Sequence, residues 1–134
     1  MGKTTLVGKL RMQPGQRTLI MNAPLGYVEG LDPLPEGIEL VEDPEGKYDF
    51  VHLFAMDSAE LKRHGPVALE SVTYDGVLWI SYPKRSSKVK TDLSRDMGWD
   101  VVANAGLRPV TQVSIDETWS ALRFRPIEQV GKGR

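Results

Sequence analysis

Two long apolar segments separated by a helical pattern constrain the fold of this chain most. Residues 48–56 (YDFVHLFAM) are apolar almost throughout, and residues 76–83 (GVLWISYP) repeat that composition. Apolar runs of this length are typical of strands that are buried on both faces of a parallel sheet. Residues 57–72 lie between them and are predicted to form a helix that starts at an Asp-Ser cap and is interrupted near Gly65 and Pro66.

The flanking segments extend this strand–helix–strand unit on both sides. The pattern predicts a short helix over residues 4–12, a strand over 18–23 and a short strand over 38–42. A second helix is predicted from Thr91 to a C-cap at Gly106, followed by two alternating strands over 107–126. The predicted fold class is α/β: a single three-layer Rossmann-like domain over residues 1–134, with an ordered core at about 12–126. Its mostly parallel sheet of about six strands ends in an antiparallel hairpin.

One connection leaves two arrangements open. The residues DPEGK between the strand at 38–42 and the strand that starts at Tyr48 are too few for a crossover helix. Either the two strands pair as a hairpin, or they lie apart in the sheet and the connection spans the gap between them.

Composition excludes several classes of site. The chain contains no cysteine, so disulfides, thiol nucleophiles and thiolate metal sites are excluded. Its two histidines have no partners at ligand spacing, and no metal site is expected. Residues 2–5 (GKTT) resemble the end of a P-loop but lack the preceding strand and glycine. No apolar segment is long enough to cross a bilayer and no secretory signal is visible, so we expect a cytoplasmic protein without membrane association.

The charge is unevenly distributed although its net value is only −1. Five cations and one anion lie between Tyr82 and Arg95, directly after the second buried strand. Ligands of open α/β sheets bind at the carboxyl ends of the strands, and a following helix start would favour an anion there. Asn22 ends the first strand at the same edge and could complete a small cleft. The predicted ligand-binding residues are Asn22, Ser81, Tyr82, Lys84, Arg85, Ser86, Ser87, Lys88, Lys90, Thr91 and Arg95. The alternative is a solvated basic loop.

The order of segments resembles class I methyltransferases. Residues 10–24 (LRMQPGQRTLIMNAP) are similar to their first strand with its Pro-Gly turn, YDFVHLFAM to their fourth strand and DGVLWISYPK to their fifth. Residues 106–126 resemble their terminal hairpin. The strings YDFVHLF, LWISYPKRSSKVKTDLSRD and TWSALRFRP also resemble a family of small uncharacterised bacterial proteins, a domain of unknown function. The first resemblance implies a methyltransferase-like scaffold.

The loop after the first strand argues against the cofactor of that class. A cofactor loop needs glycines for a tight turn and close approach, whereas residues 22–27 (NAPLGY) contain only Gly26, and Pro24 removes a backbone donor. We therefore do not expect S-adenosylmethionine, and the cofactor is unknown. Glu42 or Asp43, after the second strand, could hold ribose hydroxyls or could form an acidic surface turn.

Three functional hypotheses follow. The first is a binding module rather than an enzyme, which recognises an anionic small molecule or an acidic partner at the basic corner. The second is a methyltransferase-like enzyme that uses a nucleotide-type cofactor. The third is an interaction protein, for example a homodimer through the terminal hairpin. Nucleic acid is not an expected partner, because its recognition needs a broader basic face than one loop. No catalytic residue is assigned.

Overall fold

The computed structural model describes residues 5–31 and 34–131. Apart from Thr5, the tetrapeptide at 2–5 that resembles a P-loop therefore lies outside the described residues. The elements in chain order are α1 (Leu6–Lys9), β1 (Arg17–Met21), η1 (Glu29–Leu31), β2 (Glu39–Val41), β3 (Tyr48–Phe54), α2 (Ser58–Ser71), β4 (Val72–Pro83), α3 (Asp100–Asn104), β5 (Leu107–Ser114), β6 (Trp119–Pro126) and η2 (Ile127–Gln129).

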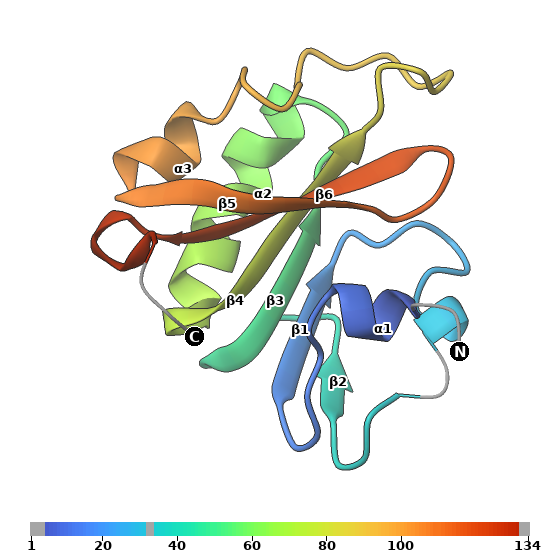
Figure 1. The fold of residues 1–134 in the computed structure, drawn as a ribbon, viewed down its shortest axis with the longest axis vertical. Coiled ribbons are helices and arrows are strands. Elements are labelled where there is room, and N and C mark those ends of the chain that lie inside the picture. The colour runs from blue at the N-terminus through green and yellow to red at the C-terminus, as the bar shows by residue number, and fades with distance from the viewer. Residues whose placement is uncertain (1–4, 32–33, 132–134) are drawn as a thin grey trace.

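A single six-stranded sheet organises the molecule in the order β2-β1-β3-β4-β6-β5 (Figure 1). The strands β2, β1, β3 and β4 are parallel to one another, β6 is antiparallel to β4, and β5 is antiparallel to β6. The predicted α/β fold class is confirmed. The open connection is also resolved: β2 is an edge strand parallel to β1, so residues 42–47 span the gap back to the start of β3.

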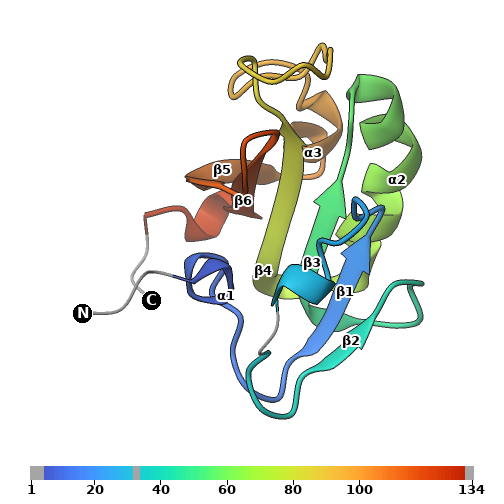
Figure 2. The same ribbon diagram turned by 90° about the vertical axis from the view of Figure 1, so that its right-hand side faces the viewer.

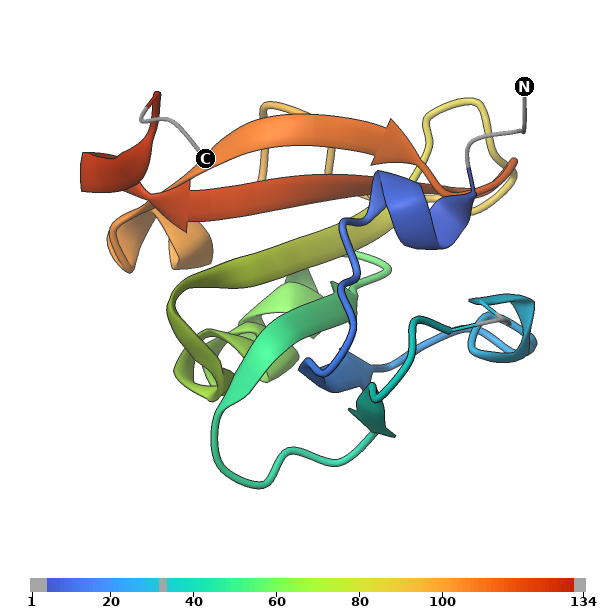
Figure 3. The ribbon, with the colours of Figure 1, turned by 60° about the horizontal axis from the view of Figure 1, so that its bottom comes forward.

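The two faces of the sheet are covered differently. Figure 2 shows α1 and η1 on one side of the sheet, which we call the α1 face, and α2 with α3 on the other, the α2 face. The connection from α1 to β1 runs across the α1 face past β4 and β3 (Figure 3). The indole Nε1 of Trp79 fixes this connection by donating to the Leu10 carbonyl at 2.8 Å.

The predicted interruption near Gly65 and Pro66 is wrong, because α2 continues through both residues to Ser71. Gly65 is buried with Val101 and Leu61 beside it, so the absence of a Cβ there permits close packing. Pro66 lies on the exposed side, where water can hydrate the backbone carbonyl that its missing N–H leaves without an intrahelical partner.

The predicted helix over residues 91–106 is also wrong for its first half. Only Asp100–Asn104 are helical, and residues 84–99 form an irregular loop at the top of Figure 1. Gly98 takes a φ of 96°, and the indole of Trp99 donates to the Ser94 carbonyl at 2.7 Å. These contacts fold the loop back on itself, so that Leu93 and Trp99 are buried without a helix.

The helices in the described part of the chain are all too short or too polar to span a membrane.

Candidate functional site

Ser81 and Tyr82, the first residues of the predicted basic corner, are buried. The Ser81 hydroxyl lies 2.7 Å from Nε2 of His52, and the Tyr82 hydroxyl accepts a hydrogen bond from the Gln112 carboxamide at 3.1 Å. Burial raises the pKa of Tyr82. In this structure neither side chain is exposed to a ligand at the surface, although both lie at the expected edge of the sheet.

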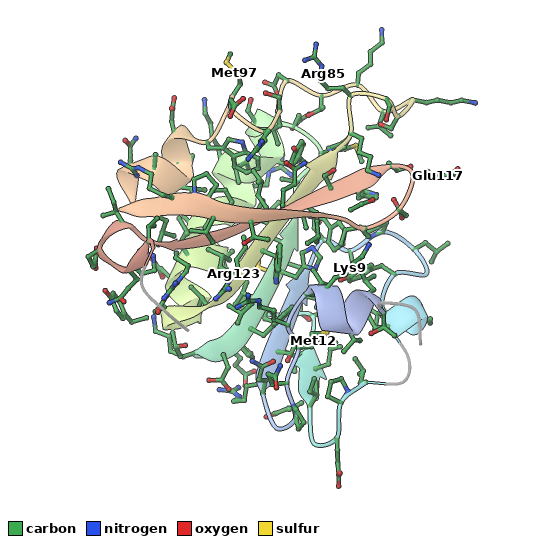
Figure 4. All side chains as sticks on the ribbon, in the orientation of Figure 1. Lys9, Met12, Arg85, Met97, Glu117 and Arg123 are labelled. Carbon is green, nitrogen blue, oxygen red and sulfur yellow. The ribbon has the colours of Figure 1, made fainter. Side chains whose placement is uncertain are left out.

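The following residues form an exposed loop with its own hydrogen bonds. The Lys84 ammonium donates to the Ser114 hydroxyl at 2.7 Å, and the Ser87 hydroxyl donates to the Lys84 carbonyl at 2.8 Å. Figure 4 shows Arg85 and Met97 on this loop, outside the sheet. A hollow of about 360 Å³ lies along it and is lined by Arg85, Ser87, Val89, Lys90 and Thr91. Ser86, Lys88 and Arg95 are also exposed.

The helix start that the anion hypothesis required is absent from this loop. The loop instead directs Asp92 to the start of α2, where its carboxylate accepts hydrogen bonds from the Ser58 hydroxyl and from the Ser58 N–H at 2.8 Å. These bonds lower the pKa of Asp92. A second carboxylate, that of Asp57, accepts from the Glu60 N–H at 2.9 Å. Protein carboxylates therefore already occupy donors at this helix start.

Asn22 lies at a different hollow from the basic corner. It follows β1 directly, takes a φ of 64° and donates from Nδ2 to the Phe54 carbonyl at 3.2 Å. The adjacent cleft has a volume of about 290 Å³ and is bounded by the end of β1, the residues after β2 and the middle of α2. Its lining residues are Met21, Asn22, Glu42, Asp43, Pro44, His64 and Val67.

The walls of this cleft combine acidic and apolar groups. Glu42 and Asp43 are exposed on the side of β2, and the half-buried His64 lines the cleft from α2. Carboxylates accept hydrogen bonds from hydroxyl groups and attract cations. Among the described residues, no group of three His, Asp or Glu side chains is placed to hold a metal ion.

A buried polar network on the α1 face was not predicted from the sequence. His52 is fully buried; its Nδ1 lies 2.8 Å from the Tyr27 hydroxyl, and its Nε2 is the atom that contacts Ser81. Burial lowers the pKa of His52 to about 3 and raises the pKa of Tyr27 above its usual range. The only sequence signal was a histidine within an apolar strand, because its two partners are 25 and 29 residues away.

No family model and no curated protein matches the chain. The structure is similar to that of DhpI in complex with SAH, with a TM-score of 0.58 and 11% identity over 86% of this chain and 78% of DhpI. It is also similar to the N-methyltransferase NodS from Bradyrhizobium japonicum WM9, with a TM-score of 0.50 and 14% identity over 84% of this chain and 87% of NodS. LepI in complex with SAM matches with a TM-score of 0.51 and 16% identity over 90% of this chain but only 39% of LepI.

These matches establish a methyltransferase-like scaffold and correct three expectations. The expectations of a non-catalytic anion-binding module, of a protein that is not an enzyme and of a chain without S-adenosylmethionine are contradicted, because similar folds carry SAM or SAH in solved structures. The glycine count was a poor criterion for the loop after β1. Asn22 makes the left-handed turn that we had required of glycine, since asparagine adopts positive φ more readily than most residues.

Proposed function

We propose that this chain is a methyltransferase-like enzyme that binds S-adenosylmethionine at the cleft beside the ends of β1 and β2. The observation that carries the proposal is the position of this cleft on the scaffold. It lies at the carboxyl edge of parallel strands, where α/β folds bind ligands, and it is lined by the residues that directly follow two neighbouring strands.

The residues that line the cleft fit the nucleoside part of such a cofactor. Glu42 and Asp43 would accept hydrogen bonds from the ribose hydroxyls, which is the role that acidic residues take in dinucleotide-binding folds. The Asn22 turn holds the chain after β1 close to the sheet through its bond to Phe54. A volume of about 290 Å³ is at the small end of ligand sites, so the cleft suits the nucleoside.

The bound cofactor would supply an electrophilic methyl group, and the residues of the chain would orient the two reactants. His64 lines the same cleft, and an imidazole nitrogen can accept the proton that a hydroxyl or amine acceptor loses on methylation. The exposed residues Arg85, Lys88, Lys90 and Arg95 of the loop after β4 would contact an acceptor that carries negative charge. Ser81 and Tyr82 would reach it only if the loop moved.

Four further expectations remain predictions. They are the membership of the small bacterial family of unknown function, a cytoplasmic location, the absence of a nucleic-acid partner and a homodimer through the terminal hairpin.

The proposal is tested by calorimetric titration of the purified protein with S-adenosylhomocysteine. We expect saturable binding that Glu42→Gln combined with Asp43→Asn weakens at least tenfold, because both ribose acceptors lose their charge. Glu45→Gln is the matched control, since Glu45 lies in the same connection but does not line the cleft. Absence of binding in the unaltered protein, or equal binding in the double variant, would contradict the proposed site.

A further inference from the structure

We propose that a second cavity, on the α1 face, binds a small oxyanion, either a phosphate or a carboxylate group. The cavity has a volume of about 390 Å³ and is lined by Arg11, Gln13, Gln16, Val77 and Arg123. Two of these residues carry guanidinium groups and two carry carboxamides, and none of the five is acidic. The cavity shares no lining residue with the proposed cofactor cleft, so this inference does not depend on the proposed function.

Arg123 supplies the buried cation of this cavity. It projects from β6 and is 3% exposed, and Figure 4 shows it on the same face of the sheet as Lys9 and Met12 of the α1 region. Arg125, two residues further along the same strand, forms a bidentate pair with Asp75 at 2.8 and 2.9 Å. Asp75 is not among the residues that line the cavity. A charge held in a low-dielectric wall attracts an anion more strongly than an exposed charge does.

Arg11 brings a second guanidinium to the cavity from the connection between α1 and β1. This residue follows the C-cap of α1 and takes a φ of 63°. Its N–H donates to the Gly8 carbonyl at 3.2 Å and the N–H of Met12 donates to the Val7 carbonyl at 3.1 Å, as is common where a helix ends. The preceding residue is fixed by the buried bond from the Trp79 indole to the Leu10 carbonyl, so the connection is held against the sheet. The end of α1 and this anchor therefore fix the position of Arg11 in the wall of the cavity.

The two glutamines provide neutral donors on the same connection. The Gln16 carboxamide accepts a hydrogen bond from the Gln13 N–H at 2.8 Å through Oε1, which directs its NH₂ group away from that contact. Carboxamide NH₂ groups and guanidinium forks are both donors, and the fork geometry matches the two oxygens of a carboxylate or phosphate. The cavity is therefore lined by two arginines and two glutamines, all of which carry donor groups.

The test is a titration of ¹⁵N-labelled protein with inorganic phosphate and, separately, with acetate, at ionic strength kept constant with sodium chloride. We expect saturable shifts of the Arg123 and Gln16 side-chain resonances with at least one probe, and the two probes separate phosphate from carboxylate recognition. Arg11→Asn should weaken that binding at least tenfold. It removes the fork and places a residue that tolerates positive φ at this position, so folding should be preserved.

Arg63→Gln is the matched control, because Arg63 is exposed on α2 and its loss changes the net charge by the same amount. The control should bind as the unaltered protein does. No saturable shift with either probe would overturn the proposal. So would unchanged affinity in Arg11→Asn, or an equal loss in Arg63→Gln, since the effect would then follow net charge alone.

Discussion

The two faces of the sheet differ in what they bury. The α2 face buries a cluster of hydrophobic residues, with Leu53, Leu78 and Ile80 at its centre, under a regular helix. The α1 face combines Phe50 and Trp79 with buried polar residues of β1, β3, β4 and β6. These buried polar residues are Thr18, His52, Ser81, Arg123 and Arg125.

The covering segments explain the difference. The interior of a regular helix satisfies its own backbone groups, and therefore it covers an apolar surface best. The irregular chain over the α1 face has carbonyl and hydroxyl groups that can form hydrogen bonds with the sheet. The Leu10 carbonyl accepts a hydrogen bond from Trp79, and the Tyr27 hydroxyl is hydrogen-bonded to His52. A face with an irregular cover can accommodate buried polar side chains that a helical cover would leave without partners.

The largest effect is expected at Leu53, whose side chain enters the α2 face from β3. Leu53→Ala should lower the free energy of unfolding by about 2–5 kcal/mol, because it removes buried methyl groups and leaves a cavity. Urea denaturation followed by circular dichroism measures this change. A loss below about 1 kcal/mol would mean that the α2 face repacks and is less specifically packed than its full burial indicates.

The adjacent residue of the same strand provides the counterpart on the α1 face. His52→Leu should lower the free energy of unfolding by roughly 2–4 kcal/mol, since the hydroxyls of Tyr27 and Ser81 would both lose their buried partner. The triple variant with Tyr27→Phe and Ser81→Ala added should recover much of this loss, because it removes the groups that had become unsatisfied. If the triple variant is no more stable than His52→Leu alone, the cost arises from shape and not from hydrogen bonding.

The pH dependence of the free energy of unfolding also distinguishes the two faces, because the α1 face contains the buried His52. Burial lowers the pKa of His52 to about 3, well below its value in the unfolded chain. The unfolded state therefore binds the extra proton first, and the contribution of His52 is complete above about pH 6.5 and is lost as the pH falls towards 3. Between pH 6.5 and 4.5 the unaltered protein should lose roughly 2–3 kcal/mol of stability that the triple variant keeps. Parallel acid profiles of the two proteins would contradict this cause.

The fold was largely predictable because its main signals are local. The buried strands at Tyr48 and Gly76, the start of α2 and the terminal hairpin all follow from the pattern of apolar residues, caps and turns. The helix predicted from Thr91 failed because the spacing of Leu93, Met97 and Val101 resembles a helical stripe. In the structure Leu93 is buried by a loop that folds back, and Met97 is 65% exposed.

The candidate sites were less predictable because they depend on contacts between distant residues. The sequence placed Asn22 at the correct edge but grouped it with the basic loop, whereas the structure places it with the acidic residues Glu42 and Asp43. From the sequence, a ribose-binding role for Glu42 or Asp43 was only one of two alternatives, the other being an acidic surface turn. The cavity of Arg11 and Arg123 joins segments more than a hundred residues apart and left no signal in either segment.

The smallest effects are expected at the starts of the two covering helices. Asp57→Ala should lower the free energy of unfolding by about 1 kcal/mol, since its carboxylate caps the Glu60 N–H at the start of a helix of 14 residues. Thr5 caps Gly8 in the same way, but α1 has only four residues, so Thr5→Ala should cost less than about 0.5 kcal/mol. The midpoints of urea unfolding for the two variants measure the difference. Equal losses in the free energy of unfolding would mean that helix formation in α1 contributes as much to stability as helix formation in α2. The distinction between a regular and an irregular cover would then be wrong. A larger loss for Asp57→Ala would support it, because the α1 face would then depend on side-chain hydrogen bonds such as those of His52 and Trp79 and not on helix formation.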